Sequence, residues 1–298
     1  MDKKKKIIIV LGVIGLVLMC GGIFLGGNPY SIPAMFSETN PPEGIQNPEE
    51  VKKSAVHSIK LNLINSHISI KPGDHFSLTG TGTFNSYVKD GVFYAGADDT
   101  KHSADLFGMK VRVPSKWVCG YGSYILTLPS KSSLDNITIN TFHCDIAADT
   151  LQASNLNINM TAGDLTINHA SADTLSIDVK GGKTIITNPV ITNAGNIQAS
   201  GDITIGDPDA SEVSLNNMSL DSSRGDLSVI GQVTGTTQLQ TGFGDITVTL
   251  PGSSENYGLT AQEGELAISP ATVSEASSEH FGDIVFASKH RSSSVHFK

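Results

Sequence analysis

The stretch Gly163-Asp164-Leu165-Thr166-Ile167 decides the fold, because its pattern returns along much of the chain. A glycine and an acidic residue lead into two apolar residues that flank a small or polar one. Self-similarity at a period of about 20 residues indicates a repeat architecture, in which one structural unit is stacked many times. Related copies begin at Gly201-Asp202, Gly225-Asp226, Gly244-Asp245, Gly264-Glu265 and Gly282-Asp283, and degenerate copies begin at Cys144-Asp145 and Gly182-Lys183.

Each repeat is predicted to contain two short strands joined by a turn. The apolar residues at positions +2 and +4 from the glycine alternate with polar ones, which is the period of a strand with one buried face. A second apolar pair lies at −7 and −5, as in Leu156/Ile158 and Leu175/Ile177. Glycine suits a positive φ in the turn between them, and aspartate can hydrogen-bond the backbone just ahead of it. The Gly-Asp pairs are therefore predicted to be structural turn positions.

Two all-β architectures fit these units, and both place every Gly-Asp turn on one edge. One is a β-solenoid with one coil per unit and equivalent strands stacked in parallel, and the other is an antiparallel meander. The spacing of 18 to 24 residues between copies favours the solenoid, because stacked turns stay in register only if the units have nearly constant length. The 24-residue step, which contains Pro208, predicts a turn insertion of five residues.

The expected fold is thus all-β: a β-solenoid-like stack of ~19-residue two-strand repeats, with an irregular N-terminal β cap, preceded by one transmembrane helix. The β domain is predicted to span residues 55–298. Residues 131–298 form the regular repeats, and residues 55–130 contain less regular strand patterns. That section is expected to cap the stack, because an open solenoid end exposes strand edges and apolar core.

The chain resembles the bacterial "putative adhesin" β-strand-repeat family over roughly residues 55–298. The resemblance rests on Leu126-Thr127-Leu128-Pro129, on Leu134-Asp135-Asn136-Ile137-Thr138-Ile139, and on the Gly-Asp series that follows. It implies an all-β repeat fold in an envelope protein, and often an envelope-stress setting. The family supplies no catalytic residues to transfer to this chain.

The N-terminus is predicted to be a retained membrane anchor. Residues 1–6 form a basic cytoplasmic stub, and residues 7–25 are nineteen uncharged, mostly apolar residues that can just span a bilayer. The basic flank predicts a cytoplasmic N-terminus with the bulk of the chain extracytoplasmic. A cleaved signal peptide and a lipoprotein modified at Cys20 are the alternatives, although no clean cleavage site or lipobox is present. Residues 26–54 contain five prolines and are expected to form a tether.

The net charge of the chain restricts the kinds of partner that it can bind. Beyond residues 1–6 the chain has 20 − 4 = 16 basic and 29 − 1 = 28 acidic residues, a formal charge of −12. This balance argues against nucleic acid as a partner, which requires clustered Lys and Arg.

Outside the membrane, Cys119 and Cys144 can form a disulfide between the cap and the first regular repeat; two unpaired thiols are the alternative.

The sequence contains no motif that carries a catalytic function, so the protein is not expected to be an enzyme. Gly181-Gly182-Lys183-Thr184 lacks the glycine five residues earlier that a phosphate-binding loop needs. The repeated aspartates could instead form a calcium ladder, but one carboxylate per unit without a double-glycine frame favours turn formation. No metal or cofactor is expected.

Position +3 of each repeat is the candidate binding face. It points outward between the buried pair and carries hydroxyl groups in several units; threonine is also a common strand residue on exposed faces. The hydroxyl-bearing members are Thr166, Thr204, Ser228 and Thr247.

The sequence therefore predicts a membrane-anchored, non-catalytic binding or scaffold module of the bacterial envelope, with an envelope protein or a glycan as partner. The alternative is an accessory component of an envelope-stress sensory system that acts through a membrane protein. A polysaccharide-active β-helix enzyme is the third hypothesis.

Overall fold

The computed structural model describes residues 56–74, 76–81, 85–96, 102–106, 109–113, 122–129, 134–207, 213–269 and 280–297. This part of the chain is almost entirely β-strand, as predicted, with no α-helix and one short 3-10 turn, η2 (Ser254–Asn256). Within it, no helix is long and apolar enough to cross a bilayer. The predicted stub, membrane span and tether (1–54) lie outside the described residues.

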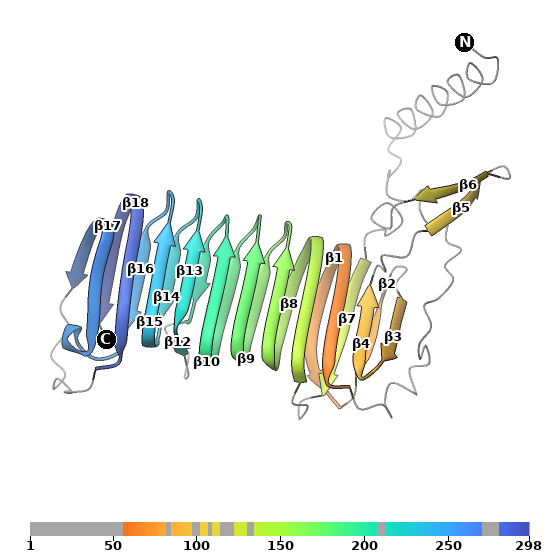
Figure 1. Ribbon diagram of the computed structural model, residues 1–298, viewed down its shortest axis with the longest axis horizontal. Helices are drawn as coiled ribbons and strands as arrows, with labels where there is room; N and C mark the ends of the chain where they lie inside the picture. Colours follow the sequence, from red (N-terminus) through yellow and green to blue (C-terminus); the bar gives the residue numbers. More distant parts are fainter. Residues whose placement is uncertain are drawn as a thin grey trace, which may run out of the picture.

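Apart from β5 and β6, which form a separate two-stranded sheet, the strands stack along a rod, with the N-terminal strands at one end and the C-terminal ones at the other (Figure 1). In chain order they are β1 (Ser58–Gly73), β2 (Ser77–Thr81), β3 (Asn85–Lys89), β4 (Val92–Gly96), β5 (His102–Leu106), β6 (Met109–Val113), β7 (Gly122–Pro129), β8 (Leu134–Met160), β9 (Leu165–Val179), β10 (Thr184–Ala199), β11 (Ile203–Ile205), β12 (Ser214–Asn216), β13 (Met218–Ser222), β14 (Leu227–Ile230), β15 (Gln232–Thr241), β16 (Ile246–Leu250), β17 (Tyr257–Ser269) and β18 (Gly282–Phe297).

Strand pairing selects the solenoid over the meander. Every pairing between successive coils is parallel, and antiparallel pairs occur only between β2 and β7, β3 and β4, and β5 and β6 among the described strands. The repeats stack in register, so that position +2 forms one continuous column. Its members are Ile68, Ile146, Leu165, Thr184, Ile203, Leu227, Ile246 and Ser293.

One coil has three inward-facing segments, where the sequence pattern predicted two. In β9 the buried side chains are Leu165 and Ile167, then Ala170 and Ala172, then Leu175, Ile177 and Val179. Two consecutive exposed residues separate each group from the next and turn the strand at a corner. The middle segment was missed because it contains alanines, whose weak hydrophobic signal does not reveal a strand period.

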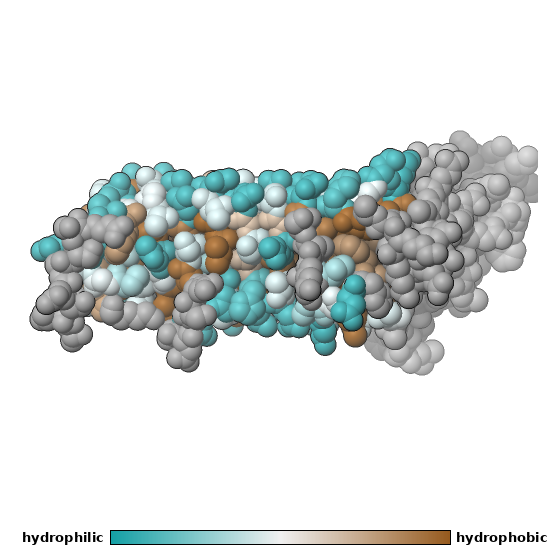
Figure 2. Space-filling model, turned by 90° about the horizontal axis from the view of Figure 1, so that it is seen from below, coloured by the Kyte–Doolittle hydropathy of each residue, from teal (hydrophilic) through white to brown (hydrophobic). Residues whose placement is uncertain are grey.

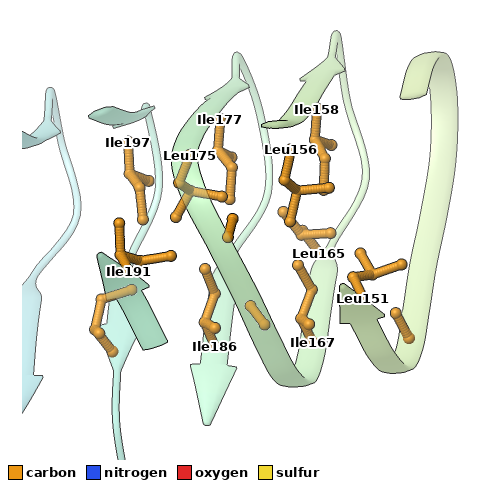
Figure 3. Packing of buried hydrophobic residues seen from close by; sticks show 14 of the residues in the cluster. Leu151, Leu156, Ile158, Leu165, Ile167, Leu175, Ile177, Ile186, Ile191 and Ile197 are labelled. Atoms are coloured by element: carbon orange, nitrogen blue, oxygen red, sulfur yellow. The ribbon is translucent and has the colours of Figure 1, made fainter. Parts of the chain in front are cut away.

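The core runs through the centre of the stack as layers of aliphatic side chains. In the close view, Leu156, Ile158, Leu175 and Ile177 point inward from one side of the coil toward Leu165, Ile167 and Ile186 (Figure 3). Each of these side chains is at most 3% exposed, and such burial contributes about 1.5–3 kcal/mol per side chain. No coil could bury its inner face alone, so stability comes largely from contacts between neighbouring coils.

The long step between Gly201 and Gly225 is a turn insertion of five residues, as predicted. Ile186 pairs with Ile205 and Val190 pairs with Ser214 across the same two coils. From Ile205 to Ser214 the chain advances 214 − 205 = 9 positions. In the preceding coil, the same distance from Ile186 to Val190 takes 190 − 186 = 4 positions. The stack keeps its register on both sides of the insertion, because both Ile203–Ile205 and Ser214 pair with β10.

The N-terminal section adds one regular coil and an irregular layer. Strand β1 pairs with β8 from Ser58 to Ile70, so it is itself a coil of the stack. Strands β4 and β7 also pair with β1, and β3 and β2 then add antiparallel edges to them. The predicted cap is therefore confined to strands that come after β1 in the chain.

The last two coils are stacked out of chain order. Strand β18 lies between the coil of β15 and β16 on one side and β17 on the other, so β17 is the terminal coil. The prediction that Gly282-Asp283 forms a repeat turn is therefore wrong. Gly282 pairs with Gly235, and Ile284 pairs with Thr237, so these residues belong with β15, the strand that precedes the turn at Gly244. The turn equivalent to Asp245 is occupied by Ser292, since Ile246 pairs with Ser293.

Candidate functional site

The repeated aspartates form a ladder of hydrogen bonds between coils. The Oδ1 atom of one aspartate accepts the backbone N–H of the equivalent residue in the next coil. Asp145 accepts from Asp164 at 2.9 Å, Asp164 from Lys183 at 2.9 Å, Asp202 from Asp226 at 3.1 Å, Asp226 from Asp245 at 2.9 Å, and Asp245 from Ser292 at 3.3 Å. The carboxylates thus bind the neighbouring turn, whereas the sequence suggested bonds within their own turn.

This arrangement assigns the aspartates a structural role. One carboxylate oxygen of each is already engaged by a backbone donor, and the side chains are spread along an edge instead of converging. Among the described residues, no group of three or more His, Cys, Asp or Glu side chains is placed to hold a metal ion.

The repeat glycines are required by the close approach of stacked turns. A Cβ atom on Gly163 would lie 2.0 Å from the carbonyl oxygen of Cys144, and one on Gly244 would lie 2.0 Å from that of Gly225. Gly163 has φ +114°, but Gly244 is not among the positive-φ glycines. Steric contact with the preceding coil is therefore the more general reason for glycine here.

Hydroxyl groups inside two of these turns were not predicted. Ser222 and Thr241 are fully buried, and their Oγ atoms accept the backbone N–H of Gly225 and Gly244, each at 2.9 Å. Thr241 Oγ1 also donates to the carbonyl oxygen of Gly225 at 3.1 Å. The sequence signal was a Ser or Thr three residues before the glycine.

The predicted binding positions form an aligned row on the outside of the stack. Thr204 pairs with Ser228, and Ser228 with Thr247, in successive coils. Ser294 continues the row beside Thr247, whereas Ile185 separates Thr166 from the others. All four predicted side chains are half-buried. This hydroxyl row is the first candidate interaction surface.

A second surface carries side-chain amides, and the sequence analysis missed it. Asn140 donates to Asn62 at 3.0 Å, and Asn159 donates to Asn140 at 3.0 Å and to Asn157 at 2.9 Å. A parallel chain of bonds links Asn136, Asn155 and Thr174, at 3.1 and 2.6 Å. We call this outward face the amide face; it carries these side chains on β1, β8 and β9 and continues in register onto β10, β13 and β15.

The described residues form one open hollow that could admit a ligand. A shallow, open hollow of about 480 Å³ is lined by Ser66, His67, Gly122, Ser123, His143, Asp145 and Gly163. Seen from below, hydrophobic residues make a discontinuous band along the rod between hydrophilic margins (Figure 2). The described surface therefore favours contact along faces over enclosure of a small molecule.

Cys144 is buried in the column of turns, and its sulfur forms no disulfide with another of the described residues. It lies 3.1 Å from Ser66 Oγ and donates to the carbonyl oxygen of Phe142 at 3.6 Å. Burial raises the pKa of the thiol, so the unreactive protonated form is favoured. The predicted partner Cys119 lies outside the described residues, and the disulfide between them stays a prediction.

The Toastrack DUF4097 family profile matches residues 98–281. No curated protein matches the chain. A crystal structure described as a putative cell adhesion protein from Clostridium sporogenes is 11% identical, covers 82% of this chain and 94% of its own, and superposes with a TM-score of 0.20. The family match extends over more than half of the chain, and this protein belongs to the Toastrack DUF4097 family.

Proposed function

We propose that this protein is a non-catalytic, adhesin-like binding module that holds its partner along a sheet face. The observation that carries the proposal is the lateral alignment of outward polar side chains over successive coils, as in Thr204, Ser228 and Thr247. Such rows repeat at the strand spacing of about 4.8 Å and favour many weak contacts with an extended partner.

The proposal places the β domain outside the cytoplasmic membrane, held by residues 7–25 and spaced from the bilayer by residues 26–54. The lysine cluster before an uncharged apolar run supports this orientation. Because the chain carries an excess of acidic residues, an anionic surface is a poor partner for the β domain. An envelope glycan or envelope protein fits better.

The binding role is tested with the full-length chain and purified bacterial envelope material. We expect the chain to cosediment with this material, and the double variant Thr204→Glu and Thr247→Glu to reduce the bound fraction. A chain that binds no envelope component, protein or glycan, would overturn the proposal. Localisation is tested separately: the chain should resist carbonate extraction from membranes and be cleaved by protease added to intact cells.

A further inference from the structure

Over five central coils, the amide face changes its chemistry from coil to coil with a period of two coils. Two outward rows show this, because residues two apart on one strand point to the same side. The rows are held in register by pairings of β8 with β9, β9 with β10, β10 with β13 and β13 with β15. Successive coils carry Asn157/Asn159, Ser176/Asp178, Asn196/Gln198, Ser219/Asp221 and Gln238/Gln240.

The alternation is strict over these five coils. Coils with two amides are separated by coils with one hydroxyl and one carboxylate. These ten positions carry no lysine, arginine or aromatic side chain, and the only charged residues among them are Asp178 and Asp221. Eight of the ten side chains are therefore neutral hydrogen-bonding groups, which suits a neutral partner rich in hydroxyl and amide groups.

Three asparagines of β8 are held by hydrogen bonds before any partner arrives. Asn159 is bonded to both Asn140 and Asn157, and Asn155 is bonded to Asn136 and Thr174. Each amide retains unused hydrogen-bonding capacity, because the group offers two donors and two acceptor sites. Asn155, Asn157 and Asn159 are also exposed. Preorganised polar groups lose little conformational entropy on binding.

The repeat length of this pattern along the rod indicates what kind of partner would match it. Neighbouring strands lie about 4.8 Å apart, so a pattern that repeats every second coil has a period of roughly 10 Å along the rod. An extended β-linked polysaccharide turns each sugar over relative to the last, and its two-sugar repeat has nearly the same length. One sugar would then lie over each coil. Sugars that present the same face would lie over coils that carry the same kind of side chains.

We infer that the amide face binds a neutral β-linked polysaccharide with a two-sugar repeat, lying along the long axis of the rod. The inference rests on the proposed binding function and adds the ligand class and the face. Asn157, Asn196 and Gln238 bond to sugar hydroxyl or acetamido groups in the amide coils. Asp178 and Asp221 accept hydrogen bonds from sugar hydroxyls in the coils between them.

The probe is chitin, the insoluble β-linked polymer of N-acetylglucosamine, together with its soluble oligomers. We expect the full-length chain to cosediment with chitin and not with α-linked starch. In calorimetry, affinity for the oligomers should rise in steps of two sugars. The triple variant Asn157→Ala, Asn196→Ala and Gln238→Ala should lose at least tenfold in affinity.

Two further variants separate recognition from folding. Asn157→Asp, Asn196→Asp and Gln238→Glu keep the shape of the side chains but replace each amide donor by a carboxylate, and should lose binding to the same extent; a cooperative thermal unfolding transition checks that this variant is folded. The control variant carries Gln152→Ala and Ser171→Ala. These two residues pair with each other in the middle segment of the coil, which is not part of the amide face, so this variant should bind as the parent does.

The outcomes distinguish this inference from the binding function as such. Binding to envelope material with no binding to chitin would overturn the polysaccharide inference and leave the proposed function standing. Chitin binding that survives both triple variants would overturn the assignment of the amide face. Loss of binding to every envelope component would overturn both.

Discussion

The Oδ1 atom of Asp226 lies 2.9 Å from the backbone nitrogen of Asp245, although the two residues are 19 positions apart in the chain. This bond joins the turns of adjacent coils, and the same contact recurs at other coils of the stack. It explains why an acidic residue follows the glycine in so many repeats: the side chain caps a donor of the next coil.

Asp226→Ala should lower the free energy of unfolding by about 1 kcal/mol, because it removes one hydrogen bond to a backbone donor. Asp226→Asn retains an Oδ1 acceptor in the same place and should recover most of that loss. Chemical denaturation of the two variants and the parent checks this. Equal destabilisation by both substitutions would show that the carboxylate charge, and not the acceptor, is what the ladder requires.

Neighbouring glycines provide a matched test of the stacked turns. A Cβ on Gly182 would lie 2.0 Å from the carbonyl oxygen of Gly163, at φ +117°, whereas a Cβ on Gly181 would meet nothing closer than 3.7 Å. Gly182→Ala should therefore cost about 1–3 kcal/mol, the range for forced backbone strain. Gly181→Ala should change stability by less than about 0.5 kcal/mol. Thermal melting of both variants decides, and similar losses would contradict the steric explanation.

The repeat period, the solenoid and the five-residue insertion could be predicted from sequence, since they depend on spacing and apolar periodicity. The amide face could not, because asparagines in successive coils are 19 or more residues apart and become neighbours only through stacking. The order of the last coils also escaped prediction. Gly282-Asp283-Ile284 matches the turn pattern, yet its glycine pairs with Gly235 in another segment. Local patterns do not specify which coil a strand will join.

Thr184 interrupts an apolar column and offers a stabilising substitution. It is 0% exposed, it stacks between Leu165 and Ile203, and its Oγ1 has no hydrogen-bond partner among the described residues. Thr184→Val has nearly the same shape and removes an unsatisfied buried hydroxyl, so stability should rise by about 1 kcal/mol. The control Thr166→Val lies on the outer side and should stay within about 0.5 kcal/mol. A loss of stability in Thr184→Val would indicate that the hydroxyl has a partner.

Tyr257 should make the fold sensitive to alkaline pH. Burial raises the pKa of its hydroxyl to about 12, from 10.0 for a free tyrosine. The folded state therefore keeps this proton where the unfolded state has lost it. The associated stability is complete below pH 10 and is lost as the pH rises toward 12, by about 2–3 kcal/mol in total.

Tyr257→Phe should abolish this alkaline loss, whereas Tyr94→Phe, in β4, should leave it in place. The Tyr257 hydroxyl has no hydrogen-bond partner among the described residues, so its removal should not destabilise the protein at pH 7. Denaturation curves at pH 7 and pH 11 measure both effects. An unchanged alkaline loss in Tyr257→Phe would assign the transition to another group.

The order of the terminal coils can be tested by comparing two isoleucines. Ile246 is 0% exposed within the stack, whereas Ile268, on the terminal strand β17, is 48% exposed although it points toward the coil interior. If β18 separates β17 from the rest of the stack, Ile246→Ala should cost about 2–5 kcal/mol and Ile268→Ala less than about 1 kcal/mol. Phe286→Ala in β18 should behave like Ile246→Ala, because the Phe286 side chain is fully buried between two coils.

If the coils instead followed chain order, β17 would lie inside the stack and β18 at its end. Ile268→Ala would then be the severe variant, and urea denaturation of the three proteins would reveal this directly.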